Sequence, residues 1–198
     1  MSGPNNHLVV FAKAPRLGRV KSRLARDIGA VGAWAFYRRT LAALVRRLKG
    51  DARWTLWLAV APDRAVVDDG PWPRGVNRIG QGGGGLGARM ARVMALLPPG
   101  PVVIVGADIP DIRAADAAAA FRALGRHDAV FGPAADGGYW LVGLRRRPRF
   151  RDPFKTVRWS TEHALADTRA NLQGARVALL RELEDVDDGA AFRRRANR

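Results

Sequence analysis

The chain has 198 residues, of which 47% are hydrophobic, and its 34 basic and 18 acidic side chains give a formal charge of +16. The hydrophobic content excludes an intrinsically disordered chain, and the lack of cysteine excludes disulfides, thiolate metal sites and cysteine nucleophiles. No apolar run reaches the roughly 18 residues that a membrane-spanning helix needs. We expect one cytoplasmic domain over residues 1–188 and a basic tail over residues 189–198.

Apolar runs of strand length alternate with helical patterns along the chain. We expect strands at 8–12, 54–61, 76–81, 102–105, 129–131, 139–144 and 177–180, and helices at 34–48, 86–97, 112–124 and 160–172, the last one capped by Ser160. This alternation predicts an α/β fold with a mainly parallel sheet covered on both faces. The link from Phe131 to Tyr139 is too short for a crossover helix, so one antiparallel strand is expected there.

The first predicted strand ends in a loop that contains Pro15, Gly18 and five cations. A basic loop at the carboxyl edge of a sheet is where α/β proteins bind phosphorylated ligands. Lysine and arginine side chains there would contact phosphates, and arginine can do so with two hydrogen bonds. The alternative is an ordinary surface loop in an arginine-rich protein.

Asp108 follows the apolar strand at 102–105, so it is expected at the same edge of the sheet. Mg²⁺ commonly takes one or two protein carboxylates together with water and substrate phosphate, and Asp108 suits that role. Alternatively, Asp108 caps the turn that follows. In the acidic segment 182–188, Asp185 or Asp187 is a candidate for a second ligand, and a solvated acidic loop is the alternative.

Two glycine-containing segments have the character of ligand-binding loops. Asp136 precedes Gly137 and Gly138, which would let the backbone approach a ligand closely, although Asp-Gly also forms plain hairpin turns. The run at 82–87 has the G-x-G-x-x-G spacing of dinucleotide-binding proteins. The strand before this run is too polar for the central strand of that fold, which argues against a nicotinamide or flavin enzyme.

Taken together, five segments resemble the bacterial DUF2064 family, also labelled radical-SAM/selenodomain-associated transferase 1, of the nucleotide-diphospho-sugar transferase (GT-A) superfamily. The segments are 11–24, 81–90, 106–110, 132–140 and 159–161, in family order across about residues 9–187. More distantly, the chain is similar to 2-phospholactate and molybdenum-cofactor guanylyltransferases. The resemblance implies a GT-A three-layer sandwich with one antiparallel strand.

The resemblance also implies roles for individual residues. Asp108 would bind the catalytic divalent ion, Mg²⁺ or Mn²⁺, with Asp187 as a further candidate ligand. The residues expected to bind the nucleotide are Ala12, Lys13, Gly18, Lys21, Arg23, Gln81 and Arg89. From the residues themselves, Asp136 is our candidate for orienting the acceptor and accepting its proton. The residues expected to bind the acceptor are Gly137, Gly138, Tyr139, Trp159, Ser160 and Thr161, although Trp159 is equally suited to the core.

The chain departs from the family pattern at four positions. Gly85 stands where the family usually has Asp, which removes a carboxylate. Leu17 replaces Pro, Ser22 replaces Thr and Ala107 replaces Ser. These changes point to altered specificity or reduced activity.

The sequence supports three hypotheses for function. The first is a cytoplasmic, metal-dependent glycosyltransferase that takes a nucleotide-diphospho-sugar and a small-molecule acceptor, with no membrane or nucleic-acid partner. The second is a nucleotidyltransferase that releases pyrophosphate from a nucleoside triphosphate; the same loop and metal ligand serve both reactions. The third is an arginine-rich nucleic-acid-binding protein, which the net charge suggests. Because the basic residues are spread along the chain, a small polyanion is the favoured ligand.

Overall fold

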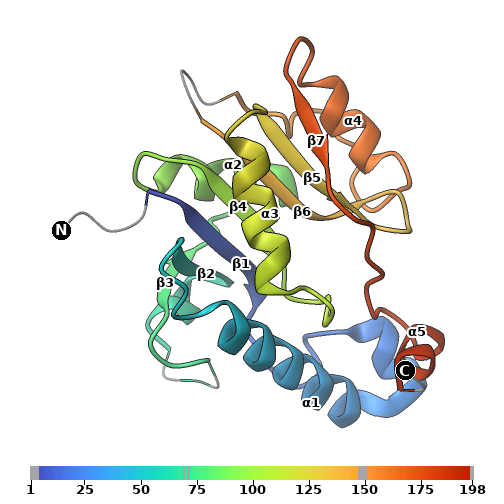
Figure 1. Cartoon of the computed structure of the whole chain (residues 1–198). Coiled ribbons are helices and arrows are strands. Elements are labelled where there is room, and N and C mark those ends of the chain that lie inside the picture. The colour runs from blue at the N-terminus through green and yellow to red at the C-terminus, as the bar shows by residue number, and fades with distance from the viewer. Residues whose placement is uncertain (1–4, 69, 71, 147–150, 197–198) are drawn as a thin grey trace.

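A seven-stranded sheet runs through the middle of the molecule (Figure 1). The computed structural model describes residues 5–68, 70, 72–146 and 151–196. In spatial order the strands are β3 (Asn77–Gly80), β2 (Thr55–Ala61), β1 (His7–Lys13), β4 (Val102–Gly106), β6 (Tyr139–Leu144), β5 (Ala129–Pro133) and β7 (Val177–Leu179). Among these described strands only β6 is antiparallel, to both β4 and β5, which confirms the predicted topology.

Helices cover both faces of the sheet and give the three layers that were predicted (Figure 1). On one face, α1 (Ser22–Leu48) and α3 (Ala114–Leu124) pack on side chains such as Leu8 and its β4 neighbour Val103. On the other face, α2 (Leu86–Leu96) and α4 (Ala164–Ala170) cover side chains such as Val9 and Ile104. Successive residues of a strand point to opposite faces, so both faces of β1 and β4 are apolar and their sequences read as continuous hydrophobic runs.

The long element α1 consists of two helical parts joined at Gly29, which has φ 78° and ψ 156°. A positive φ of this kind is readily adopted by glycine and strained for other residues. The second part carries the buried stripe expected from the sequence, including Tyr37, Leu41 and Leu44. The first part begins directly after Lys21, which has the left-handed values φ 50° and ψ 48°.

The C-terminal residues form a helix, α5 (Gly189–Ala196), that packs against both parts of α1 (Figure 1). The rings of Phe192 and Phe36 meet edge to face, with their centroids 5.4 Å apart. Arg195 Nη1 lies 2.6 Å from Asp111 Oδ2 in the β4–α3 loop. The expected basic tail is therefore helical over 189–196, because Phe192 and Ala191 give it an apolar side; residues 197–198 lie outside the described part. The domain boundary at residue 188 stays a prediction.

Arg146 closes the far end of α2, away from the carboxyl ends of the strands. Its guanidinium donates to the carbonyl oxygens of Gly100 (2.7 Å) and Leu97 (3.1 Å), and also to those of Met94 and Pro98. The last carbonyls of a helix lack partners within the helix, and a cation beside them also interacts favourably with the helix dipole. Arg146 therefore acts as a side-chain cap for α2.

Between β2 and β3 lies a short 3-10 helix, η1 (Asp63–Val66). Across the described residues, none of the helices combines the length and the apolar character that crossing a bilayer would require.

Candidate active site

A cavity of about 530 Å³ opens where the carboxyl ends of β1 and β4 meet. This edge is the usual ligand site of parallel α/β sheets, and the volume lies in the range of small-molecule pockets. Most of the residues predicted from the sequence line this one cavity: Ala12, Lys13, Lys21, Arg23, Gln81, Arg89, Asp108, Asp136, Gly138, Tyr139, Trp159, Ser160, Thr161 and Asp187. The two exceptions are Gly18 and Gly137.

Lys21 stands between two carboxylates of this cavity. Its Nζ lies 2.6 Å from Asp187 Oδ1 and 3.4 Å from Asp108 Oδ2. The Lys21 side chain is only 4% exposed, whereas the side chains of Asp108 and Asp187 are 46% and 42% exposed. One buried cation thus joins three distant parts of the chain, while both carboxylates keep access to the cavity.

The acidic segment near the C-terminus contributes two interacting carboxyl groups. Burial and the charge of Asp187 raise the pKa of Asp185 to about 6. Burial acts in the same direction on Asp187, but the charge and hydrogen bond of Lys21 outweigh it and lower the pKa of Asp187. Asp187 is therefore the more acidic member of the pair, and it holds Lys21 as a carboxylate.

The Tyr37 hydroxyl fixes the end of β1, where the cavity begins. The Tyr37 hydroxyl accepts a hydrogen bond from Lys13 N–H at 2.9 Å and donates one to Lys13 O at 3.0 Å. Burial, with the nearby charge of Asp108, raises the pKa of Tyr37, so the hydroxyl stays protonated. The sequence marked Tyr37 as part of a helical core stripe, and nothing in that periodicity distinguishes it from its apolar neighbours.

Gln81 is buried, and its side-chain amide donates to Ala12 O at 3.1 Å and Ala59 O at 2.9 Å. Gln81 was expected to contact a nucleotide, and its amide nitrogen is engaged by the backbone of β1 and β2. Gln81 lines the cavity and at the same time braces these two strands.

The two predicted glycines outside the cavity have structural roles. Gly18 has φ 70° in the loop before α1. Gly137 has φ 81°, and a Cβ atom there would lie 2.3 Å from Glu162 O, so the β5–β6 turn rests directly on the 158–163 loop. Asp136 Oδ1 accepts a hydrogen bond from Gly138 N–H at 2.9 Å, which fixes the carboxylate at the turn.

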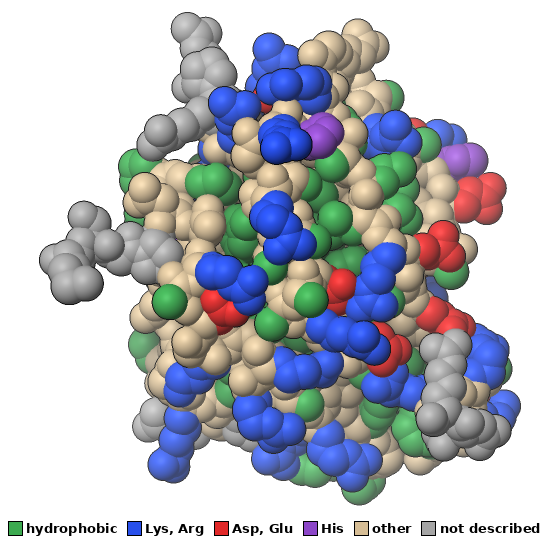
Figure 2. Space-filling view, viewed as in Figure 1, with side chains coloured by type: hydrophobic (Ala, Val, Ile, Leu, Met, Phe, Trp, Pro, Cys, Tyr) green, Lys and Arg blue, Asp and Glu red, His purple; other side chains and the backbone are tan. Residues whose placement is uncertain are grey.

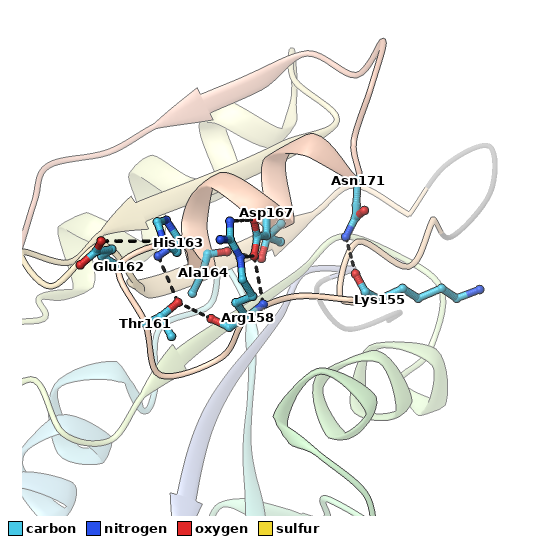
Figure 3. Close-up of polar contacts among 9 residues, drawn as sticks. Lys155, Arg158, Thr161, Glu162, His163, Ala164, Asp167 and Asn171 are labelled. Atoms are coloured by element: carbon cyan, nitrogen blue, oxygen red, sulfur yellow. Dashed lines mark hydrogen bonds and ion pairs between the residues drawn. The ribbon is translucent and has the colours of Figure 1, made fainter.

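The loop that carries Trp159, Ser160 and Thr161 is held by Asp167 of α4 (Figure 3). Asp167 accepts two hydrogen bonds from the Arg158 guanidinium, at 2.8 and 2.9 Å, and a third from Arg158 N–H at 3.0 Å. These hydrogen bonds keep the pKa of Asp167 well below its usual range. The Thr161 hydroxyl in turn donates to Arg158 O at 2.7 Å.

The expected helix at 160–172 begins later than predicted, at Ala164. Ser160 has φ 61°, which is incompatible with the extended backbone that a helix-capping serine normally adopts. The prediction that Ser160 caps this helix is therefore wrong. Ser160 instead lies in a tight loop that faces the cavity.

The donor groups at Asp108 and Asp187 fit a divalent ion that binds together with a substrate. Both carboxylates are about half exposed, and both lie beside the ammonium of Lys21 in the basic loop. In the described part of the chain, no three acidic, histidine or cysteine side chains meet closely enough to hold a metal. Two carboxylates completed by phosphate oxygens and water is the arrangement typical of Mg²⁺.

A second, strongly basic cavity of about 680 Å³ adjoins the first and shares Lys13 and Arg89 with it. Its wall includes Arg16, Arg19 and Arg64. The loop 82–85 borders this cavity, but β3, the strand before that loop, lies at the edge of the sheet. A dinucleotide-binding fold places its glycine-rich loop after a central strand, so the structure does not support that alternative.

The cations are widely distributed over the surface. Figure 2 shows Lys and Arg side chains scattered across the visible face, with acidic side chains among them. On the part of this face that the structure describes, they do not gather into a single stripe.

The chain matches the family model described as "Uncharacterized protein conserved in bacteria (DUF2064)" over residues 44–161. Among proteins of curated function, none matches the chain significantly. A crystal structure from Desulfovibrio desulfuricans G20, of a candidate nucleotide-diphospho-sugar transferase, is 28% identical with a TM-score of 0.83. The match covers 93% of this chain and 83% of that one.

Two other solved structures share the fold at lower identity. CMP:2-keto-3-deoxy-manno-octonic acid synthetase in complex with CTP is 13% identical, with a TM-score of 0.60 over 98% of this chain and 97% of that one. Glucosyl-3-phosphoglycerate synthase from Mycobacterium tuberculosis, in complex with Mn²⁺, UDP and glucosyl-3-phosphoglycerate, is 12% identical with a TM-score of 0.55, over 92% and 71%.

The family match covers more than half of the chain, and the fold matches that of the Desulfovibrio structure with a TM-score of 0.83. The chain therefore belongs to the DUF2064 family and has the GT-A-like fold of the nucleotide-diphospho-sugar transferase superfamily.

Proposed function

We propose that this protein is a metal-dependent glycosyltransferase that transfers a sugar from a nucleotide-diphospho-sugar to a small-molecule acceptor. The observation that carries the proposal is the Lys21 ammonium of the basic loop, which lies between Asp108 and Asp187 in a cavity that Lys13, Arg23 and Arg89 also line. Cations and carboxylates on one cavity suit a diphosphate that is bound and then released as a leaving group. The solved structures of similar fold include proteins that act on nucleotides or nucleotide sugars, which supports the same substrate class.

In this reaction the acceptor oxygen forms a bond to the anomeric carbon while the bond from that carbon to the diphosphate breaks. The electron pair of that bond leaves with the nucleoside diphosphate, and Lys21 and Arg23 stabilise the negative charge that develops there. The proton of the acceptor hydroxyl passes to the Asp136 carboxylate, which the Gly138 N–H holds in place. A divalent ion held by Asp108 and Asp187 would supply further neutralisation of the diphosphate.

A second candidate is nucleotidyl transfer, in which an acceptor attacks the α-phosphate of a nucleoside triphosphate and pyrophosphate leaves. The second basic cavity favours it, because Arg16, Arg19 and Arg64 provide room and charge for the additional phosphate. Lys13 and Arg89, which line both cavities, would then contact the phosphates between them.

Calorimetric titration of the full chain with UDP-, GDP- and CDP-sugars and with nucleoside triphosphates, with and without Mg²⁺ or Mn²⁺, tests the donor class. Incubation with candidate acceptors then distinguishes the reactions: nucleoside diphosphate release supports glycosyl transfer, and pyrophosphate release supports nucleotidyl transfer. If no nucleotide binds, and DNA or RNA is retained with a steep salt dependence that Asp108→Ala leaves unchanged, the protein is instead a nucleic-acid binder.

A further inference from the structure

An aromatic ring in the middle of the sheet is left partly uncovered. Phe11 lies on β1, a central strand whose preceding residues Leu8, Val9 and Val10 are fully buried. Phe11 itself is only half-buried and lines the main cavity. Its partner on β4 is Gly106, where a Cβ atom would meet nothing within 4 Å. The floor of the cavity is thus an apolar ring with open space beside it.

A second ring lines the same cavity from the 158–163 loop. Trp159 is half-buried, with its ring centroid 6.2 Å from that of Tyr139 and 6.3 Å from that of Phe154. A Cβ atom added to Gly87 of α2 would lie 2.9 Å from Trp159 Cζ2, so the indole packs directly on the helix backbone. Leu86, the residue before Gly87, is 46% exposed and also borders the cavity. These contacts fix the indole while part of it stays accessible.

The cavity therefore has two chemically different halves. The charged half comes from the loop before α1, the end of β4 and the acidic segment. The apolar half comes from the sheet face under α2 and from the Trp159 loop, and it is continuous with the core on that face. Exposed aromatic surface in a pocket is stabilised when an apolar group of a ligand covers it.

Building on the proposed function, we propose that the acceptor is a small alcohol whose hydroxyl is attached to an aromatic or branched aliphatic body. The body packs between Phe11 and Trp159. The hydroxyl then lies toward Asp136, because Tyr139 of the apolar half follows the Asp136–Gly138 turn directly in the chain. A fully polar acceptor, such as an unmodified sugar or a short polyol, would leave these rings uncovered.

Binding of probe alcohols tests this inference without any nucleotide or turnover. Amide and indole signals of the ¹⁵N-labelled full chain are followed in NMR titrations with 2-phenylethanol, cyclohexylmethanol and glycerol. We expect the first two to shift the signals of Phe11, Tyr139 and Trp159, and glycerol to leave them in place. Trp159→Ala should weaken binding of 2-phenylethanol by about tenfold. Phe121→Ala, which removes a ring on α3 that does not line the cavity, should leave it unchanged.

Gly106→Val is a second variant, which keeps Trp159 and the loop intact. The new side chain would project into the open space beside Phe11, so it should block the probes even if Trp159→Ala fails to fold. Equal shifts with glycerol, or unchanged affinity in Gly106→Val, would overturn the inference. Displacement of the probes from this half by uridine, cytidine or guanosine would also overturn it, since the rings would then hold the base. Probe binding without transfer from any nucleotide donor would leave the subsite in place and count against the proposed function alone.

Discussion

Lys21 Nζ and Asp187 Oδ1 lie 2.6 Å apart although the two residues are 166 positions apart in the chain. This ion pair joins the basic loop to the acidic segment, and Asp108 adds a second carboxylate at 3.4 Å. Because one buried ammonium faces both carboxylates of the cavity, Lys21 is a sensitive position for both stability and binding.

Lys21→Met should lower the free energy of unfolding by about 1–3 kcal/mol, because it leaves Asp187 and Asp108 without their shared cation. The loss stays below that of a fully buried pair, since both carboxylates are about half exposed. The same change should weaken nucleotide binding by about 1–3 kcal/mol. Urea denaturation and calorimetry measure the two effects.

Lys49→Met is the matched control, because Lys49 is outside the cavity and its ammonium donates to Arg74 O at 3.1 Å. Nucleotide affinity that is equal in Lys21→Met and the unmodified protein would count against a role for the basic loop in nucleotide binding.

Asp108→Asn should reduce turnover that depends on a divalent ion while leaving the fold intact. Mutation of a residue that only hydrogen-bonds to a metal ligand typically lowers activity about 10–100-fold. Removing the charge of the ligand itself should lower the rate at least as much. Asp111→Asn, three positions away and outside the cavity, serves as the comparison. The measurement is the initial rate against Mg²⁺ or Mn²⁺ concentration, with circular dichroism to check folding. A variant with the same metal dependence as the unmodified protein would contradict the assignment of Asp108.

Arg146→Ala should destabilise the protein by about 1–3 kcal/mol, because several carbonyls at the end of α2 lose a charged donor. Arg145→Ala provides the contrast: its ion pair with Asp128 spans 4.0 Å at the surface, and such pairs contribute about 0–1 kcal/mol. Thermal and urea unfolding of the two variants under the same conditions give the comparison. If both variants lost the same free energy of unfolding, the hydrogen bonds of Arg146 at the end of α2 would contribute no more than a surface ion pair.

His7 should make stability depend on pH. Its side chain is buried, its Nδ1 accepts a hydrogen bond from Trp57 Nε1 at 3.3 Å, and Nε2 has no partner in the described part of the chain. Burial and the charge of Arg146 lower the pKa of His7 below 6.5 in the folded protein. The unfolded chain therefore binds more protons between the two pKa values, so stability falls as pH drops through 6.5 and levels off below the folded pKa.

His7→Gln keeps an acceptor for Trp57 but cannot titrate. Urea unfolding of both proteins between about pH 5 and 7.5 should show the unmodified protein losing stability relative to His7→Gln as the pH falls. A difference between the two that stays constant over this range would mean that His7 has the same pKa in both states.

The strands and the edge that holds the site could be predicted because they depend on local pattern. Apolar runs define β1 and β4, and the carboxyl ends of parallel strands share one edge, which brings Lys13 and Asp108 together. The antiparallel direction of β6 follows from the short link after Phe131. These inferences need only periodicity and the length of a connection.

Contacts between distant segments could not be predicted in this way. The polar partners of Gln81 and Tyr37 are backbone groups of β1 and β2, which no side-chain pattern marks. Ser160 has a left-handed φ in a loop that Asp167 holds through Arg158, and a serine ahead of a helical pattern does not reveal that loop in the sequence. Helix α5 has only a few apolar side chains in an arginine-rich segment. These side chains pack on Phe36 of α1, and that distant contact leaves no pattern in the sequence.

The break at Gly29 and the small hydrophobic cluster around Phe192 set the first part of α1 and α5 apart from the rest of the molecule. Leu24, Phe36 and Val186 pack in this cluster, separately from the two larger cores on the sheet. Few apolar contacts hold the first part of α1 and α5, so these two segments should undergo local unfolding together while the sheet stays intact. Amide hydrogen exchange would then be faster in both segments than in β1 and β4, and each such opening would release Lys21 from Asp187.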